Sequence, residues 1–546
     1  SARRETHALL EKNPELIKSL PENFMAEEVS LLLKENQAII ALAKIQEQKI
    51  AIAPKTPEYF GALFLEAQIL KALRRGEEAD YILLTISADG ELGGADRAML
   101  QITKDAWNAN DHDRAFQFIN RLLERFPETS YKDEALYIKG HLFEETHQLA
   151  EAKNVYLELH DSTVSLEIKL KTLKRIAWLY LQQESYVFAA DSFQKMFATA
   201  EEMLSTAQKP KFDELDNLHH HAMFWQAFAL SELDSATLRT LHHPSAESIW
   251  ESLSKMQPPT FYSMLAGKFL AGGTSELKLV SRSSHTDSDM RQCVLDLPAR
   301  LIDTLAELKS VDLSQFAQFE VDWFLANQMD SAKFSELSRT PIVRIQTDTT
   351  RASLYSQFAS PTLAIRAASR ALKEVAPLET SDERLSRCAD FLLDLSYPTA
   401  EIEVFREAAS TFSVSESTLL AIARTESHFD PKAISSVGAM GLMQLMRETA
   451  KTEGLLAEND LFDPKTNISL GTKHISRLLS TYDGNKIFAI AAYNAGQSAV
   501  NRWRARMPNI EPYLWLELIG YPETRNYVKS VLLAEEIYLQ KLLRTN

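Results

Sequence analysis

Residues 413–431 read Ser413-Val-Ser-Glu-Ser-Thr-Leu-Leu-Ala-Ile-Ala-Arg-Thr-Glu-Ser-His-Phe-Asp-Pro431. The stretch begins with the Ser-x-x-Glu pattern of a helix capping box and ends at a proline, which cannot continue a helix. Between these two signals the sequence predicts one helix of about 12 to 14 residues. The helical period then determines which of its side chains share a face.

Glu426 lies on the apolar face of this predicted helix. Leu419, Ile422 and Ala423 precede it at the spacing of one helical face. Partial burial and the nearby negative end of the helix dipole both disfavour the charged form, so we expect a raised pKa for Glu426. Such a carboxylic acid can act as a general acid at neutral pH. The alternative is that Glu426 turns outward, or pairs with Arg424 or a distant lysine.

The composition predicts a helical protein of several domains. The 546 residues are 45% hydrophobic and include only 16 glycines and 19 prolines. This length exceeds one ordinary hydrophobic core, and low glycine and proline contents favour helices. We therefore expect an all-α protein in three parts: a superhelical domain of helix-pair repeats at 1–270, a helical linker domain at 271–400, and the domain that carries the chemistry at 401–546.

Breaks in the helical pattern support this division. Residues 205–216 predict a loop within the first part, and residues 271–290, rich in glycine and serine, are the strongest linker signal in the chain. Helical periodicity resumes over 295–400 and breaks at Tyr397-Pro398, because proline restricts the residue before it.

A period of 37 residues runs through the first part. Ala115, Ala152 and Ala189 stand in register, and each is followed four positions later by a larger apolar or aromatic residue. Gly140 and Ala177 are small residues in the preceding predicted helices. The pattern resembles the tetratricopeptide class of helix pairs, and the alternative is an irregular superhelix without true repeats. Both predict a curved helical array.

The charge distribution argues against nucleic-acid binding. The formal net charge is −16, whereas phosphate neutralisation needs a surplus of lysine and arginine. Residues 401–546 hold 16 basic and 17 acidic side chains, and the first 400 residues hold 43 and 58. The acidity therefore belongs to the first 400 residues, and an anionic polymer would meet less repulsion at the C-terminal part.

Other sequence features leave the compartment open. Cys293 and Cys388 can form a disulfide or remain two inert buried thiols, and we slightly favour thiols. No apolar run is long enough to predict a membrane-spanning helix. The first residues lack the apolar core of a secretory signal, so we expect that any export signal has been removed.

The run His219-His220-His221 does not predict a metal site. Adjacent positions of a helix point about 100° apart, so the three imidazoles cannot converge on one ion. We therefore expect neither a metal nor another cofactor.

Three further motifs follow the helix of Glu426. Residues 435–446 read Ser435-Ser-Val-Gly-Ala-Met-Gly-Leu-Met-Gln-Leu-Met446, a glycine-interrupted apolar loop where the backbone can approach a ligand. Residues 490–496 read Ile490-Ala-Ala-Tyr-Asn-Ala-Gly496, a helix end with glycine at its cap. Residues 521–528 read Tyr521-Pro-Glu-Thr-Arg-Asn-Tyr-Val528.

Together with Glu426-Ser and the following Phe-Asp-Pro, these motifs resemble, in their order, those of the soluble lytic transglycosylase domain. Upstream, Phe261-Tyr-Ser-Met-Leu-Ala-Gly-Lys-Phe-Leu270 is similar to the Tyr-x-x-Leu-Ala stretch of the large periplasmic members. The resemblance is strong from residue 400 onward and weaker before it. It implies a lysozyme-like, mostly helical catalytic domain, carried by an α-superhelix that curls into a ring in large members.

The resemblance also implies a reaction on peptidoglycan. Glu426 would protonate the glycosidic oxygen between N-acetylmuramic acid and N-acetylglucosamine and then act as a base. The muramic 6-hydroxyl would attack the anomeric carbon, which leaves a 1,6-anhydro product. One carboxylate serves both steps, whereas ordinary glycosidases use two.

The substrate-binding residues that the resemblance implies are Ser435, Gln444, Met446, Tyr493, Asn494, Glu523 and Tyr527. Glu523 and Tyr527 are expected to lie deeper than the others. For Glu523 we favour an ion-pair role beside Arg525 over that of a second catalytic carboxylate. The chain departs from the family pattern at Arg447, where proline is usual, and at Thr399-Ala400, where an aromatic or basic pair is usual.

Two other functions compete with this one. A goose-type lysozyme-like hydrolase shares the fold and the glutamate but adds water, and a non-catalytic scaffold would only hold glycan. For the favoured function, the resemblance implies a periplasmic monomer that binds peptidoglycan glycan strands. Cell-wall synthases or amidases are its possible partners.

Overall fold

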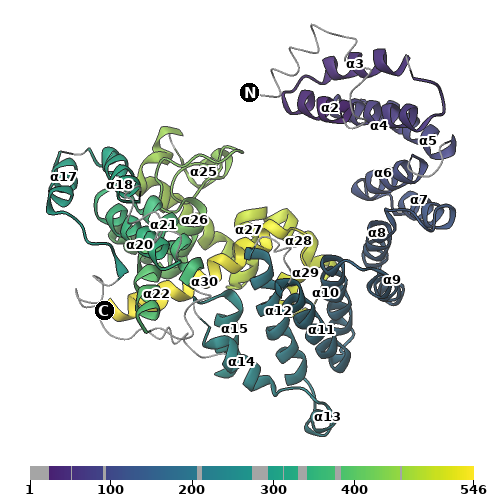
Figure 1. Cartoon of the computed structure of the whole chain (residues 1–546). Coiled ribbons are helices and arrows are strands. Elements are labelled where there is room, and N and C mark those ends of the chain that lie inside the picture. Colours follow the sequence, from purple (N-terminus) through teal and green to yellow (C-terminus); the bar gives the residue numbers. More distant parts are fainter. Residues whose placement is uncertain are drawn as a thin grey trace. The chain divides into compact units, whose positions relative to one another are not determined.

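The computed structural model describes residues 24–50, 52–89, 94–205, 212–256, 258–272, 293–311, 313–329, 341–375, 383–455, 458–508 and 510–545 (Figure 1). Within these ranges the chain forms helices and no β-strand; the only β-type pairing is two isolated bridges that join Met440 to Ile434 and to Leu445. The predicted all-α class is confirmed. The chain divides into two compact units, residues 1–241 and 242–546, and the finer division into three parts stays a prediction.

The described helices of the first unit follow one another in chain order. They are α2 (Phe24–Lys34), α3 (Ala38–Ile50), α4 (Pro57–Ala72), α5 (Gly76–Asp89), α6 (Ala95–Asn108), α7 (His112–Arg125), α8 (Lys132–Glu145), α9 (Leu149–Ser162), α10 (Leu166–Gln182), α11 (Tyr186–Ser205), α12 (Phe212–Ser231) and α13 (Ser235–Thr240). From α2 to α12, each helix packs on the next along the chain. Figure 1 shows this succession clearly from α6 to α9.

Small residues allow the close packing of the first unit. Ala115, Ala152 and Ala189, in α7, α9 and α11, are fully buried. A Cβ atom at Gly140 in α8 would overlap the ring of Tyr156 in α9, so only glycine fits there. The 37-residue pattern therefore marks the points where neighbouring helices touch.

The loop predicted at 205–216 is too long. α11 ends at Ser205 and α12 already begins at Phe212. The loop signals stop at Pro210, and residues 211–216 contain neither glycine nor proline. Residues 273–292, which hold most of the predicted linker at 271–290, lie outside the described ranges.

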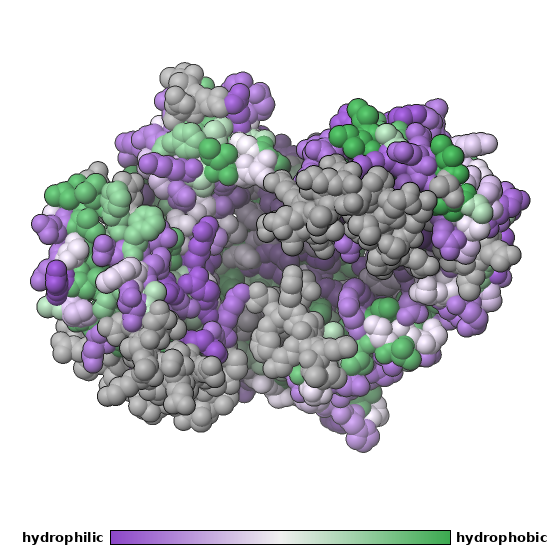
Figure 2. Space-filling view, turned by 45° about the horizontal axis from the view of Figure 1, so that its top comes forward, coloured by the Kyte–Doolittle hydropathy of each residue, from purple (hydrophilic) through white to green (hydrophobic). Residues whose placement is uncertain are grey.

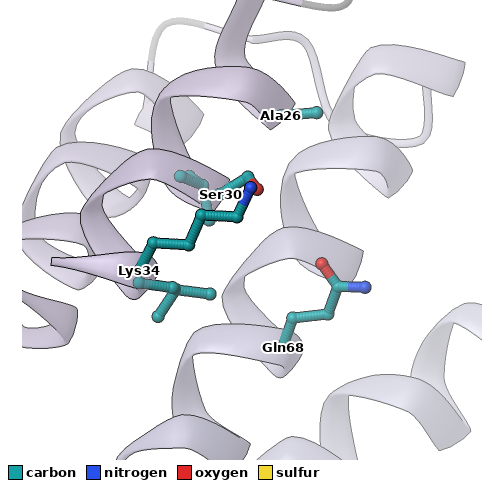
Figure 3. Close-up of a pocket in the computed structure, with 6 residues that line it drawn as sticks. Ala26, Ser30, Lys34 and Gln68 are labelled. Carbon is teal, nitrogen blue, oxygen red and sulfur yellow. The ribbon is translucent and has the colours of Figure 1, made fainter. Parts of the chain in front are cut away.

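A hollow of about 330 Å³ lies on the first unit between α2 and α4. Figure 3 shows that Ala26, Ser30 and Lys34 line it from one helix and Gln68 from the other. Lys34 is the only ionisable side chain among its lining residues, which include no carboxylate and no imidazole.

The second unit holds the remaining described helices. They are α14 (Ala246–Ser254), α15 (Phe261–Leu270), α17 (Ala299–Ser310), α18 (Ser314–Met329), α20 (Pro341–Phe358), α21 (Pro361–Val375), α22 (Glu383–Ser396), α23 (Ile402–Phe412), α24 (Glu416–Ser427), α25 (Arg447–Glu453), the 3₁₀ helix η3 (Glu458–Phe462), α26 (Pro464–Thr481), α27 (Lys486–Ala495), α28 (Gln497–Arg506), α29 (Pro512–Leu518) and α30 (Pro522–Thr545). α22 ends just before Tyr397-Pro398, as predicted.

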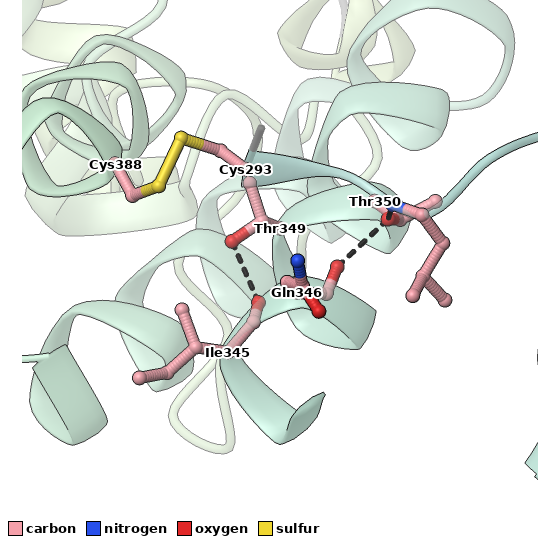
Figure 4. Close-up of a disulfide and its surroundings, with 7 residues drawn as sticks. Cys293, Ile345, Gln346, Thr349, Thr350 and Cys388 are labelled. Carbon is pink, nitrogen blue, oxygen red and sulfur yellow. Dashed lines mark hydrogen bonds between the residues drawn. A yellow bond between two sulfur atoms is a disulfide. The ribbon is translucent and has the colours of Figure 1, made fainter. Parts of the chain in front are cut away.

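Cys293 and Cys388 form a disulfide, with 5.4 Å between their Cα atoms (Figure 4). The slight preference for free thiols was wrong, because the packing of α20 against α21 and α22 closes a separation of 95 residues. Next to the disulfide, the backbone N–H of Leu295 donates to Thr350 Oγ1 at 2.8 Å, which attaches this segment to α20.

Replacing both cysteines by serine is expected to destabilise the second unit by about 2 to 3 kcal/mol, because the cross-link limits the unfolded chain. The measurement is the urea midpoint of this unit with and without reductant. Reductant should lower the midpoint of the wild type and leave that of the double variant unchanged. Equal midpoints for the wild type in the two conditions would contradict the expectation.

The surface of the second unit includes exposed aromatic side chains on α18. Phe319 and Trp323 are each 67% exposed. Figure 2 shows hydrophobic residues gathered on the left of the view, the side on which α17 and α18 lie in Figure 1.

No helix in the described ranges combines the length and the apolar character needed to cross a bilayer.

Candidate active site

The helix that carries Glu426 is α24, and its cap differs from the prediction. Ser415, not Ser413, is the N-cap, and its hydroxyl accepts a hydrogen bond from the backbone N–H of Thr418 at 3.4 Å. Ser413 instead ends α23 in a left-handed conformation, with φ 55°. Because the turn between α23 and α24 uses Ser413, the helix starts two residues later than the capping pattern indicates.

Glu426 occupies the last turn of α24. Leu419, Ile422 and Ala423, on the same face, are fully buried, as predicted. The hydroxyl of Tyr527 in α30 donates a hydrogen bond to Glu426 Oε1 at 2.7 Å. The carboxyl group therefore points into the domain.

Arg424 lies in a different environment from Glu426. Its Nε donates to the carbonyl oxygen of Ser396 at 2.8 Å, and its guanidinium carbon lies 3.9 Å from the ring centroid of Tyr397. The guanidinium is thus engaged at the end of α22. Tyr527, rather than Arg424, supplies the hydrogen bond to the carboxyl group of Glu426.

Burial raises the pKa of Glu426 from 4.5 to about 7. The hydrogen bond from Tyr527 acts in the opposite direction, because it favours the carboxylate, and the charge of Glu523 adds to the rise. The predicted upward shift is confirmed. At neutral pH, Glu426 exists in both its acid and its base form.

The charge of Glu426 acts on two tyrosines. Burial and the charge of Glu426 raise the pKa values of Tyr493 and Tyr527 well above 10. Both phenols therefore keep their protons and act as donors at neutral pH. Tyr493, in α27, donates to the carbonyl oxygen of Met443 at 2.8 Å.

The glycine-interrupted loop folds back on itself beside α24. Gly441 has φ 78°, and a Cβ there would overlap the Asn467 side-chain nitrogen and the Leu461 carbonyl oxygen. Asn467 is buried; it donates to Met440 O at 3.0 Å and accepts from the backbone N–H of Met443 at 2.8 Å. Our sequence reasoning missed Asn467, because it stands among other polar residues at the start of α26 and nothing in the sequence distinguishes it from them.

The three candidate residues of this loop differ in their surroundings. The hydroxyl of Ser435 accepts from the backbone N–H of Ala439 at 2.9 Å. The amide of Gln444 donates to the carbonyl oxygens of Ala433 at 3.1 Å and Gly441 at 2.8 Å. Met446, the N-cap of α25, is 44% exposed. Ser435 and Gln444 thus stabilise the loop, whereas Met446 is open to solvent.

The last motif joins α27 to α30. Thr524 donates to Asn494 Oδ1 at 2.7 Å. Tyr527 is buried, but Glu523 is exposed, so the expectation that both lie deep is wrong for Glu523. Glu523 stands in the first turn of α30 at the surface, and Tyr527 reaches the core one turn later.

The segment 261–270, which is similar to the Tyr-x-x-Leu-Ala stretch, contacts the helices α29 and α30. Tyr262 in α15 donates to Glu517 Oε1 at 2.7 Å, and Lys529 Nζ in α30 lies 2.8 Å from the Tyr262 oxygen. This buried group attaches α15 to the helix that carries Tyr527.

The described part of the chain contains no group of three or more histidine, cysteine, aspartate or glutamate side chains that could hold a metal ion. His221, in α12, packs its ring against Trp178 and Phe193, with centroid distances of 5.3 and 5.9 Å. The environment of this histidine is aromatic.

Comparisons with known proteins agree with this geometry. The family model described as Transglycosylase SLT domain matches residues 403–515. The soluble lytic murein transglycosylase of Escherichia coli K12 is 37% identical over 154 residues, which are 27% of this chain and 24% of that protein. The corresponding protein of Salmonella typhimurium is 38% identical over 154 residues, with the same coverage. The aligned region thus spans about a quarter of the length of these relatives.

One solved structure shows the fold. The 70 kDa soluble lytic transglycosylase of Escherichia coli matches with a TM-score of 0.60 and 20% sequence identity, over 99% of this chain and 84% of that one. This likeness supports an α-superhelix followed by a lysozyme-like domain. Residues 403–515 are thus similar to the transglycosylase SLT domain, and the solved structure shows the fold of the chain.

Proposed function

We propose that this protein is a peptidoglycan lytic transglycosylase in which Glu426 is the catalytic acid and base. The bond cleaved is the β-1,4 link between N-acetylmuramic acid and N-acetylglucosamine. Glu426 donates its proton to the glycosidic oxygen as the bond to the anomeric carbon breaks. The muramic 6-hydroxyl oxygen then bonds to that carbon and returns its proton to Glu426, so no water is consumed and a 1,6-anhydro product forms.

The observation that carries this proposal is the buried carboxyl group of Glu426, whose pKa is raised. Its pKa of about 7 allows the group to be a proton donor in the first step and an acceptor in the second. In this mechanism Glu523, which is exposed in the first turn of α30, has no role as a second catalytic carboxylate. Most two-carboxylate glycosidases hold the second group across the scissile bond.

The other candidate residues complete the proposed site. Tyr527 keeps the acid oriented through its 2.7 Å hydrogen bond. We assign sugar contacts to the loop and helix residues around it, with Met446 against an apolar sugar face. The residues in this proposed substrate-binding set are Ser435, Gln444, Met446, Tyr493, Asn494, Glu523 and Tyr527.

A periplasmic location is part of the proposal. The disulfide between Cys293 and Cys388 supports an oxidising compartment, and murein is the polymer named for the relatives. We further propose that the enzyme acts as a monomer, which light scattering of the purified chain measures directly.

Mass spectrometry of the fragments released from purified sacculi tests the function. We expect 1,6-anhydromuramyl products from the wild type and none from Glu426→Gln. Products with a reducing end that have gained one water would instead identify a hydrolase. A folded wild type that releases no fragments would support a non-catalytic glycan-binding scaffold.

Replacing Tyr527 by phenylalanine is expected to raise the pKa of Glu426 by about one unit, because a hydrogen bond to a charged group is lost. Activity requires protonated Glu426 in the first step, so it falls as pH rises through this pKa. The upper limb of kcat/KM against pH should move from about 7 in the wild type to a higher pH in the variant.

Tyr493→Phe is the matched control for this prediction. It also removes a phenol near Glu426, but that phenol donates to Met443 and not to the carboxyl group. Its upper limb should stay at the position of the wild type. A limb that moves equally in both variants, or moves to lower pH in Tyr527→Phe, contradicts the assignment.

A further inference from the structure

A polar cluster next to the ring of Tyr493 has no role in the reaction proposed above. It consists of Glu453 at the end of α25 with His474 and Arg477 on α26, and we call it the Glu453 cluster. Glu453 is only 4% exposed. Arg477 donates to Glu453 Oε1 through Nε at 3.0 Å and through Nη2 at 2.7 Å. The ion pair holds the carboxylate of Glu453 in one place.

The carboxylate of Glu453 in turn orients the imidazole of His474. His474 Nδ1 lies 3.1 Å from the same Oε1. An ionised carboxylate only accepts hydrogen bonds, so Nδ1 must carry the proton. Arg477 Nη2 also lies 3.0 Å from Nδ1. Because a protonated ring nitrogen cannot accept a hydrogen bond, the guanidinium donates to Glu453 instead. The tautomer and the ring direction of His474 are therefore set by Glu453.

The ring of His474 then supports Tyr493. The two ring centroids are 5.2 Å apart, with an angle of 55° between the planes. At its other end, the Tyr493 hydroxyl is bonded to the Met443 carbonyl at 2.8 Å. Tyr493 is thus contacted at its ring by α26 and at its oxygen by the loop. The charge of Glu426 contributes to the raised pKa of Tyr493.

We propose that His474, oriented by Glu453, is a positioning residue that acts through the hydroxyl of Tyr493. His474 contacts no reacting atom in this scheme. The inference rests on the proposed function, because it assigns Tyr493 a role in turnover. It adds that α25 and α26 set the direction of the Tyr493 ring, which carries that hydroxyl.

The polar chemistry of the cluster favours a positioning role over simple packing. Apolar side chains of similar volume could join α25 to α26 without the cost of burying a carboxylate. A hydrogen-bonded imidazole adds a defined ring direction, which apolar packing does not need. Misplacement of a catalytic group by about 1 Å can cost up to about 100-fold in rate, so a small loss of orientation should be measurable.

A double-mutant cycle tests the proposal in the full-length protein. His474→Ala is expected to lower kcat for the release of anhydro fragments by about tenfold, with little change in KM. In a Tyr493→Phe background, the same change should lower kcat less than about twofold, since the hydroxyl to be positioned is gone. If the alanine variant does not fold, His474→Gln takes its place, because an amide can donate to Glu453 but offers no ring to Tyr493.

Conservative and control variants refine the test. Glu453→Gln keeps an acceptor for His474 Nδ1 and should retain most of kcat, whereas Glu453→Ala should lose as much as His474→Ala. Ser476→Ala is the matched control on α26: it removes a 2.9 Å hydrogen bond to Phe412 O on α23, and its kcat should stay at the wild-type value.

The outcomes separate the two proposals. If the loss from His474→Ala is the same factor with and without the Tyr493 hydroxyl, or if Ser476→Ala loses as much, the residue is structural and this inference is wrong. If the wild type releases no anhydro fragments, the proposed function itself fails, whatever the variants do.

Discussion

Replacing Glu426 by glutamine is expected to lower kcat by about 10³-fold. Glutamine keeps the size of the side chain but has no proton to donate, and general acid–base catalysis contributes about 10²- to 10⁴-fold. The effect should appear in kcat rather than in KM, because the sugar contacts remain. The measurement is the initial rate of fragment release from sacculi at pH 6 to 7, where the wild-type group is at least half protonated.

The free energy of unfolding of Glu426→Gln, measured at pH 4 and pH 8, tests whether the loss of activity comes from unfolding. The pKa of Glu426 is raised in the folded state, so its favourable contribution is present below its ordinary value of 4.5 and is lost as pH rises through about 7. Above that pH the wild type holds a partly buried carboxylate that glutamine avoids. At pH 8 the variant should be the more stable protein, by up to about 3 kcal/mol, and at pH 4 the two should match. A variant that keeps more than about a tenth of the wild-type rate excludes Glu426 as the essential acid.

Gly441→Ala is expected to destabilise the second unit by about 4 kcal/mol. The residue has φ 78°, which is strained for any L side chain, and the new methyl group would overlap Asn467 and Leu461. Asn467 would have to move and release its bonds to Met440 and Met443. The readout is the urea midpoint of the second unit, and we expect the loss of fragment release to follow it.

Gly438→Ala is the matched control. It lies in the same loop with φ 89°, but a Cβ there meets nothing within 4 Å. It should therefore show only the backbone cost of about 1 to 2 kcal/mol. If the two alanines cost the same, the close approach of Gly441 to Asn467 contributes nothing to stability.

Features that depend on local spacing could be predicted from the sequence. The all-α class follows from helical periodicity with few glycines and prolines, and the apolar face of α24 places Glu426 toward the core whatever the helix packs against. The same holds for Ala115, Ala152 and Ala189, because a small residue at a helix contact is needed in any stacked array. The family motifs between residues 426 and 528 added the expected site residues.

Two predictions were wrong because the same sequence pattern is compatible with two structures. Ser413 and Ser415 both suit a helix cap, and the turn after α23 determines which one serves. Glu523 and Tyr527 share a motif, but Glu523 is exposed in the first turn of α30 and Tyr527 is buried one turn later. Neither choice is visible without the neighbouring helices.

Contacts between distant residues were settled by tertiary structure alone. The partner of Glu426 is Tyr527, 101 positions away, and the partner of Cys293 is Cys388, 95 positions away. Burial between α24 and α30 also sets how far the pKa of Glu426 rises. Periodicity along one helix shows which face is buried, but a hydrogen-bond partner and its distance exist only once the helices have packed.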